Sequence, residues 1–350
     1  MSKDPIKVGF VGLSSQPAWS WSVAAHLPYF ATTSNYRIVA LQNSSTETAK
    51  KAARIHNLGK DIAAYGDIQS TVSDPNIDLV AVCLKVPAHL PIIEAALKAG
   101  KAVFSEWPLA RNVAEAEYLA NLAADKDARD MIAGGELGDI LQTTMLFTSP
   151  WFGATFPADA VFATDIENGA NLMSISVGHA LDALCFVLGE LRGVQGILAN
   201  NRPVVPLVDG EGKQQGTIKK TSHDHCTITG RLAGGGVATA VCQGGMSAIE
   251  KNFFWEITGT KGTLVLEGPM GNIQGFQPTV SYVKAETGSK LEKIEVEEAK
   301  DFSFNTGRAW DAFAGEGEGA VPDFQDALLR HRMLEAIYRS NEKGTREEYI

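Results

Sequence analysis

The stretch IKVGFVGLSSQPAW, residues 6–19, decides the fold of the first part of the chain. Its first half is a short apolar run rich in Val and Gly, which ends at Gly12 in a Ser-rich turn. A segment of helical character, residues 23–30, follows this turn. A strand, a glycine turn and a helix in this order are typical of the first βαβ unit of a nucleotide-binding sheet.

The same alternation continues to about residue 128. Apolar runs recur at residues 36–41, 78–84 and 102–105, and helical segments at 46–56, 90–98 and 113–124. Ser45 or Thr46 is the expected N-cap of the helix after the second run, because both side chains can accept a backbone N–H. Strands that alternate with helices at this spacing predict a Rossmann domain, a doubly wound parallel sheet, over residues 1–128.

The pattern changes after about Arg129. A helix is expected at about residues 170–188, a polar loop at 203–220 and a C-terminal helix at about 323–340. The remaining segments alternate apolar and polar residues between Gly-rich turns, which predicts an α+β domain over residues 129–350 with a large, mostly antiparallel open sheet. These strand-like segments are residues 140–148, 194–200, 226–232, 237–243, 253–259, 263–267 and 280–283.

Charge and cysteine usage exclude several classes of function. The chain has 350 residues, with 31 Lys and Arg against 41 Asp and Glu, a net charge of −10 and no long basic run. Direct nucleic-acid or membrane binding is therefore disfavoured. Four dispersed cysteines without a C-x-x-C pair favour a reduced, cytoplasmic location. His223 and His225 share a strand face but lack further ligands nearby, so we expect no metal site.

The turn after the first strand departs from the G-x-G-x-x-G fingerprint, since only Gly12 is present. Ser14 still offers a backbone N–H and a hydroxyl to a phosphate. The second run is followed by Asn43 and Ser44 with no acid to hold ribose hydroxyls, which favours NADP or dual use. On these residues alone, dinucleotide binding and an ordinary βα turn remain open alternatives.

Several longer segments carry a family resemblance. They are residues 6–13, 77–84 with the PAH of 87–89, 95–101, the SEWPL of 105–109, 178–182 and 326–340. In this order they resemble the glucose-fructose oxidoreductase, inositol dehydrogenase and rhizopine-catabolism (Gfo/Idh/MocA) family. The sequence is most similar to the fungal branch that contains the galactose-regulon co-repressor, on the Gly12 turn before a Trp-bearing helix, Glu106 with Trp107, residues 165–169 and residues 178–179.

The resemblance implies a Rossmann domain joined to a domain whose open sheet often mediates dimers, so we expect a homodimer. It also implies NADP or NAD as cofactor. Trp151 and Asn171 are assigned to a substrate pocket. The assigned cofactor-binding residues are Gly12, Leu13, Ser14, Trp19, Asn43, Ser44, Pro87, His89, Glu106 and Trp107.

Three departures from the family pattern affect the chemistry. Trp107 stands where the family usually has a catalytic Lys, and indole cannot exchange a proton at neutral pH. Such a loss typically costs about 10²–10⁴ in rate. The acid usual four residues before His179 is Ile175, which leaves His179 as the one candidate catalytic residue, against the alternative of a core histidine. A strand and an Arg-containing loop usual in the family are missing near residues 127–133.

These observations support three hypotheses. The first is an NAD(P)-dependent oxidoreductase that transfers hydride between nicotinamide and a small hydroxyl- or carbonyl-bearing metabolite, with His179 moving the proton. The second is a non-catalytic NAD(P)-binding co-regulator, in the cytoplasm and also the nucleus, that binds an acidic segment of a transcriptional activator. The third is a shortened member without activity. We rank the oxidoreductase first, because sequences of this kind more often belong to enzymes.

Overall fold

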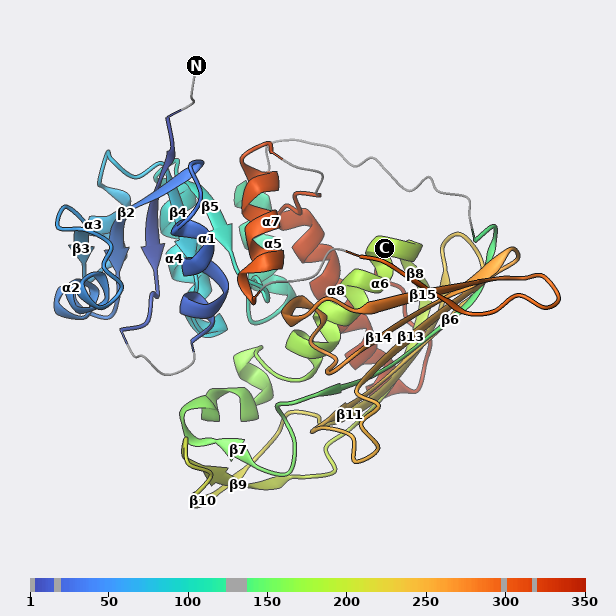
Figure 1. The fold of residues 1–350 in the computed structure, drawn as a ribbon. Helices are drawn as coiled ribbons and strands as arrows, with labels where there is room; N and C mark the ends of the chain where they lie inside the picture. The colour runs from blue at the N-terminus through green and yellow to red at the C-terminus, as the bar shows by residue number, and fades with distance from the viewer. Residues whose placement is uncertain (1–3, 16–19, 124–136, 297–300, 317–319) are drawn as a thin grey trace. The chain divides into compact units, whose positions relative to one another are not determined.

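The computed structural model describes residues 4–15, 20–123, 137–296, 301–316 and 320–350 (Figure 1). The chain forms two compact units, Met1–Asp127 with Ala299–Ala327, and Ala128–Glu298 with Leu328–Ile350. The domain boundary expected at residue 128 stays a prediction. The expected division did not assign Ala299–Ala327 to the first unit, to which these residues belong. Trp19 and the expected gap at residues 127–133 lie outside the described residues.

The first unit contains a five-stranded parallel sheet in the order β3-β2-β1-β4-β5. This order confirms the predicted doubly wound sheet. The direction in which strands are added reverses between β1 and β4, and ligands of such sheets bind outside the carboxyl ends of the strands at this reversal. The strands are β1 (Ile6–Val11), β2 (Tyr36–Gln42), β3 (Ala63–Tyr65), β4 (Leu79–Val82) and β5 (Ala102–Ser105).

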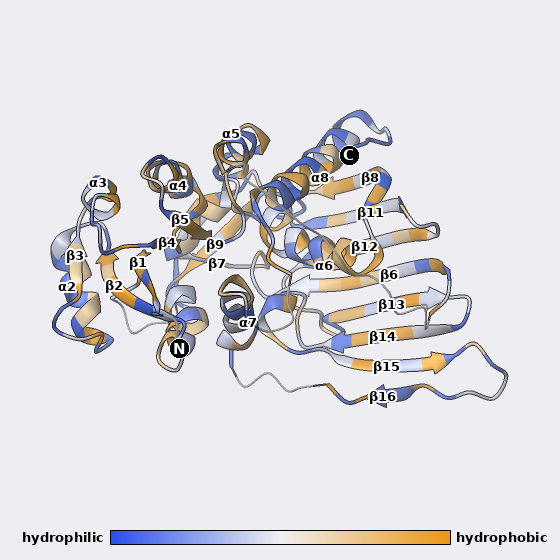
Figure 2. Ribbon diagram, turned by 90° about the horizontal axis from the view of Figure 1, so that it is seen from above, coloured by the Kyte–Doolittle hydropathy of each residue, from blue (hydrophilic) through white to orange (hydrophobic). Residues whose placement is uncertain are grey.

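Helices cover both faces of this sheet (Figure 2). Helices α1, α2 and α7 contribute to one buried cluster, whereas α4 contacts both α3 and α5. The Ser45 side chain accepts the Thr48 N–H and so confirms Ser45 as the cap of α2. The helices are η1 (Ser22–His26), α1 (Leu27–Phe30), α2 (Thr46–Ile55), α3 (Ile68–Val72), η2 (Val86–Ala88), α4 (His89–Lys98), α5 (Val113–Ala123) and α7 (Ser303–Phe313).

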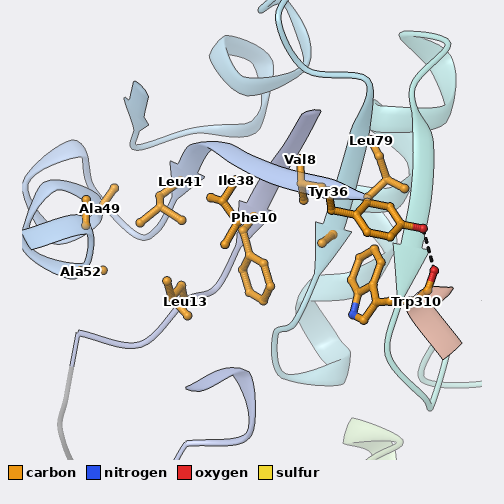
Figure 3. Close-up of a cluster of buried hydrophobic side chains, with 12 residues drawn as sticks. Val8, Phe10, Leu13, Tyr36, Ile38, Leu41, Ala49, Ala52, Leu79 and Trp310 are labelled. Carbon is orange, nitrogen blue, oxygen red and sulfur yellow. Dashed lines mark hydrogen bonds between the residues drawn. The ribbon is translucent and has the colours of Figure 1, made fainter. Parts of the chain in front are cut away.

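Helix α7 brings Trp310 into the centre of the first unit (Figure 3). The indole is fully buried and stacks on Phe104 with ring centroids 3.8 Å apart. The Trp310 carbonyl accepts the hydroxyl of Tyr36 at 2.8 Å. The sequence analysis did not predict this helix, which carries Gly307 and Thr306, residues of weak helix propensity. Packing of the aromatic side chain therefore stabilises α7 more than its own propensity does.

The second unit is built on an eight-stranded sheet in the order β16-β15-β14-β13-β6-β12-β11-β8 (Figure 2). Neighbouring strands are antiparallel except β6 and β12, which are parallel. This arrangement confirms the predicted mostly antiparallel sheet. The strands are β6 (Ile140–Ser149), β8 (Leu191–Ala199), β11 (His225–Leu232), β12 (Val237–Gly244), β13 (Phe253–Gly259), β14 (Gly262–Gly268), β15 (Thr279–Lys284) and β16 (Glu292–Ile294).

Helix α8 (Phe324–Lys343) covers the edge strand β8. The backbone N–H of Gly196 donates to the Ser340 hydroxyl, and that of Leu198 donates to the Asn341 side chain. Ile337 packs directly on Gly196, where a Cβ atom would lie 2.7 Å from its Cγ2. The exposed N–H groups of this edge are thus satisfied by the helix rather than left for another strand. The other helical segments of the unit are η3 (Ala158–Thr164), η4 (Ile166–Asn168), η5 (Met173–Val177), α6 (Gly178–Leu188) and η6 (Ile273–Gly275).

The prediction of a loop at residues 203–220 is wrong. Strands β9 (Val204–Val208) and β10 (Gln214–Lys219) form an antiparallel hairpin, and β7 (Phe156–Pro157) pairs with β9 in parallel. The Asp209 carboxylate accepts the N–H of Lys213 and so closes the turn. Pro206 inside the apolar run favoured a loop, because proline cannot donate to a strand ladder.

A buried ion pair joins α8 to the start of β8. Arg330 donates to both carboxylate oxygens of Glu190, at 2.5 and 3.0 Å, and the Tyr349 hydroxyl donates to the same carboxylate at 2.8 Å. Burial by itself would raise the pKa of Glu190, but the bonds and charge of Arg330 and the Tyr349 bond outweigh it and lower this pKa. The folded state therefore holds Glu190 ionised more strongly than the unfolded chain does.

We predict that Glu190→Gln destabilises the protein at pH 7 by about 2 kcal/mol, because it removes the ionised acceptor of the buried Arg330, which keeps Asp182 at 3.0 Å as a second partner. A lowered folded-state pKa contributes stability above the unfolded pKa of about 4.3, and this contribution disappears as pH falls through the folded value. The difference in unfolding free energy between wild type and variant should therefore shrink from pH 7 to pH 3 in urea titrations. A difference that stays constant over this range would contradict the assignment.

Candidate functional site

Gly12 lies immediately after β1, at the point where the order of the parallel strands reverses. Its N–H donates to the carbonyl of Gln42 at 3.0 Å, and its φ of +94° favours glycine. A Cβ atom here would lie 2.2 Å from the carbonyl oxygen of Cys83. The backbones that leave β1 and β4 thus touch, and only glycine fits between them.

Polar bonds shape the loops that follow β1 and β2. The Asn43 side chain donates to the carbonyl of Leu13 at 2.9 Å and thereby ties the two loops together. The Ser14 N–H donates to the Ser22 hydroxyl at 3.3 Å, and its carbonyl contacts Nε2 of His56 at 2.7 Å. The Ser14 N–H, expected to meet a phosphate, is therefore already engaged within the protein.

His89 supports the loops that follow β4 and β5. The side chain is buried at the start of α4, directly after η2, which contains Pro87. Its Nε2 faces the carbonyl of Leu84 at 2.9 Å and its Nδ1 the carbonyl of Leu109 at 3.3 Å. These contacts fit a structural role, and direct cofactor contact by Pro87 and His89 stays a prediction.

Glu106 and His26 meet at the carboxyl end of β5. Glu106 Oε1 lies 2.5 Å from His26 Nε2, and the Trp310 indole donates to His26 Nδ1 at 3.0 Å. Indole is only a donor, so Nδ1 must present a lone pair and the ring proton must sit on Nε2. His26 is therefore a neutral imidazole that donates to the Glu106 carboxylate. Its side chain is 1% exposed, whereas that of Glu106 is 20% exposed.

The ligand atoms of His26, Cys83 and Glu106 lie within 4.8 Å of one another, a spacing that suits a metal ion. The hydrogen bonds of His26, however, do not suit a metal ligand. A histidine that binds metal through Nε2 donates its Nδ1–H to an acceptor, whereas Nδ1 here faces the N–H of Trp310. Burial and the charge of Glu106 also raise the pKa of the Cys83 thiol, which disfavours the thiolate ligand. The donor set fits an organic ligand better than a metal.

The other predicted site residues belong to the second unit. His179 is the second residue of α6 and is half-buried, and Trp151, just after β6, is 37% exposed. The side-chain oxygen Oδ1 of Asn171 accepts the N–H groups of Met173 and Ser174 at 2.9 and 3.3 Å. The Asn171 side chain thus satisfies two N–H groups at the start of η5, the helical turn that leads to His179. A substrate pocket at Trp151 and Asn171 stays a prediction.

His225 is the first residue of β11 and takes part in a different cluster, whereas His223 precedes the strand, so the two histidines do not share a strand face as expected. The buried Asp224 carboxylate accepts the backbone N–H groups of Asn201 and Arg202, the Lys220 ammonium at 3.2 Å and His225 Nδ1 at 2.6 Å. Burial by itself would raise the pKa of Asp224, but these bonds and the Lys220 charge lower it. His225 is held by this carboxylate, so the cluster stabilises the start of the strand.

The sequence of this chain matches two known protein-family models. A family model described as "Oxidoreductase family, NAD-binding Rossmann fold" matches residues 6–133, and one described as "Gal80p, C-terminal domain" matches residues 126–268. Dehydrogenase aclE of Aspergillus oryzae is 32% identical over 98% of both chains. The chain belongs to the Gfo/Idh/MocA oxidoreductase family.

Relatives of two kinds occur within this family. The galactose/lactose metabolism regulatory protein GAL80 of Kluyveromyces lactis is 31% identical over 78% of this chain and 66% of its own length. The crystal structure of a super-repressor mutant of Gal80p from Saccharomyces cerevisiae superposes with a TM-score of 0.87 at 25% identity, over 99% of this chain and 98% of that one. Both a dehydrogenase and regulators are thus similar to this chain along most of its length.

The sequence analysis missed His26 and Trp310. They come from segments 284 residues apart, and neither lies in a motif. Glu106 was assigned through the resemblance, but its contact with His26 has no local signal in the sequence.

Within the described residues, no helix combines the length and the apolar character that crossing a membrane requires.

We predict that Gly12→Ala destabilises the first unit by about 3 kcal/mol or more, because the methyl group meets the Cys83 carbonyl and the residue keeps a left-handed backbone. Gly100→Ala is the matched control. Gly100 also has a positive φ, of +71°, but nothing lies within 4 Å of its Cβ position. Denaturant unfolding followed by circular dichroism should separate the two, and equal losses would refute the close contact.

Proposed function

We propose that the chain is an NAD(P)-dependent oxidoreductase that acts on a small hydroxyl- or carbonyl-bearing metabolite. The observation that carries this proposal is the carboxyl edge of the parallel sheet. There Gly12 leaves no side chain between β1 and β4, and the Glu106 carboxylate follows β5. These groups fit a dinucleotide, because Gly12 permits the tight turn after β1 at the point where the strand order reverses, and the carboxylate accepts hydroxyl or amide donors. The similarity to dehydrogenase aclE over the whole chain supports it.

The residues of this chain have separate tasks in the proposed reaction. The nicotinamide, when bound, supplies or accepts the hydride. Asn43 and Ser44 follow β2 and carry no charge, so they neither pair with nor repel a 2′-phosphate, which is compatible with NADP as well as NAD. Trp107 shapes the site beside Glu106 without exchanging a proton. His179 moves the proton to or from the substrate oxygen, with Trp151 and Asn171 near the substrate.

The second candidate is an NAD(P)-binding co-regulator that binds a transcriptional activator. It is favoured by the Gal80p C-terminal model, which covers residues 126–268, and by the structural match to Gal80p. Trp107 and Ile175 support it too, because they replace side chains that exchange protons in enzymes that the chain resembles. Under this proposal the dinucleotide is a ligand that stabilises the protein and is not consumed.

We also propose a homodimer formed through the open face of the large sheet. Residues paired between neighbouring strands share a face. The pairs Ile197–Thr227, Thr227–Val241, Val241–Leu146 and Leu146–Phe254 form one row across five strands. Gly196, next to Ile197, faces α8, so this row lies on the opposite face. Ile197 is 70% and Leu146 43% exposed, as expected of an apolar surface that binds another copy.

We predict that a dinucleotide raises the melting temperature. A ligand at 100 times its Kd adds about 2.7 kcal/mol to the unfolding free energy. Thermal-shift measurements with NAD and NADP should therefore show a clear increase with at least one of them. Wild type should then turn over at least one member of a panel of sugars and carbonyl compounds, and His179→Ala should lower kcat by about 10²–10⁴ without lowering cofactor affinity.

The same measurements separate the two candidates. Cofactor binding without turnover, together with capture of an activator segment, would favour the co-regulator. Equal kcat for wild type and His179→Ala would remove the catalytic role of His179. No stabilisation by either dinucleotide would contradict both candidates.

We predict that Ile197→Glu makes the protein monomeric in light scattering coupled to size-exclusion chromatography. A charge at the middle of an apolar interface is costly to bury. Phe186→Glu, on α6 and 65% exposed, is the matched control and should leave the mass unchanged. A wild-type monomer, or a dimer that survives Ile197→Glu, would contradict the proposed interface.

A further inference from the structure

The orientation of a dinucleotide follows from the strand order. In doubly wound sheets the pyrophosphate lies at the turn after β1, and the adenosine ribose lies beside the end of the next strand, here β2. The other half of the dinucleotide then extends toward β4 and β5. Glu106 directly follows β5 and is partly exposed, so its carboxylate belongs to the nicotinamide end of the site. This step rests on the proposed dinucleotide binding.

At this end, Trp310, His26 and Glu106 of the first unit are joined in series by hydrogen bonds. Trp310 donates to His26 Nδ1, which leaves the proton of the neutral ring on Nε2. That N–H donates to Glu106 at 2.5 Å. A carboxyl group at neutral pH is ordinarily ionised, and a donated N–H stabilises the ionised form. The imidazole therefore orients the carboxylate without contributing a positive charge of its own.

The two redox forms of the cofactor differ in charge at this position. The oxidised nicotinamide ring carries one positive charge, and the reduced ring carries none. We propose that the triad of Trp310, His26 and Glu106 makes the site bind the oxidised dinucleotide more tightly than the reduced one. Glu106 supplies the negative charge, and His26 and Trp310 are positioning residues.

The role of Trp310 follows from what its removal permits. Without the indole N–H, the imidazole is free to carry the proton on Nδ1 and turn a lone pair toward Glu106, or to become an imidazolium. The first change removes the donor that holds the carboxylate, and the second offsets its charge. Either change weakens the preference for the oxidised dinucleotide. The preference therefore depends on the hydrogen bond from Trp310 to His26, although neither Trp310 nor this bond contacts the dinucleotide.

Isothermal titration calorimetry with NAD+, NADH, NADP+ and NADPH tests the proposal on the full chain. We expect wild type to bind the oxidised form about tenfold more tightly than the reduced form, the order of magnitude for one partly screened charge pair. Glu106→Gln, which keeps the shape and removes the charge, should bring the ratio of the two Kd values to within about twofold of unity. Asp61→Asn is the control, because it removes an exposed carboxylate at the amino end of β3 and should leave the ratio unchanged.

Two further variants test the positioning residues. Trp310→Phe keeps an aromatic ring to stack on Phe104 and removes the N–H, so it should lower the ratio several-fold. His26→Gln restores an N–H donor at the position of Nε2 and should keep the ratio near that of wild type, whereas His26→Leu should lose it. A structural role alone would weaken both redox forms equally and would leave the ratio of Kd values unchanged.

The outcomes separate the proposals. No binding of any form by wild type would contradict dinucleotide binding and this inference with it. Binding with a ratio that is the same in wild type and Glu106→Gln would overturn the redox preference alone. If His26→Gln and His26→Leu give the same ratio, His26 is not a positioning residue. If Trp310→Phe does not fold, the two His26 variants decide.

Discussion

The hydrogen bond from the Trp310 indole to His26 is the interaction on which the site of the first unit depends. A buried imidazole needs a partner for each nitrogen, because an unsatisfied buried polar atom costs about 1–3 kcal/mol. Trp310 satisfies one nitrogen and Glu106 the other. Because the indole can only donate, the direction of both bonds is determined by a residue that is completely buried. The direction of the bond between His26 and Glu106 at the edge of the sheet is thus determined from within the hydrophobic core.

Trp310 contributes to hydrophobic packing as well as to hydrogen bonding. Its ring stacks on Phe104 of β5, two residues before Glu106, and its carbonyl holds Tyr36 of β2. One residue of α7 therefore contacts strands on both sides of β1. Burial of this large aromatic side chain stabilises the sheet, and the rigid setting gives the His26 ring one orientation. The direction of these hydrogen bonds also bears on metal binding. The spacing of His26, Cys83 and Glu106 suits a metal ion, but the bond that His26 accepts from Trp310 does not.

The parts of the structure that sequence predicted well are those encoded by local patterns. The Val-rich runs of the parallel sheet, the Ser45 cap of α2 and the alternating strands of the large sheet are all confirmed. Helix α7 was not predicted, because tertiary packing stabilises a segment whose Gly307 disfavours a helix. The β9–β10 hairpin was not predicted, because Pro206 in β9 is a residue that disfavours a strand. The contact of His26 with Glu106 and Trp310 depends on three distant segments, and no spacing in the sequence reports it.

The return of Ala299–Ala327 to the first unit has a consequence for biosynthesis. About 200 residues separate the end of β5 from the start of α7, so they leave the ribosome between the last strand of the sheet and the tryptophan that fills its core. At ordinary translation speeds this interval lasts roughly 10–40 s. During that time the nascent Rossmann sheet has an apolar hole where the indole belongs. Chaperones that bind exposed apolar surface have this window in which to act, and the unit becomes complete only after α7 has been made.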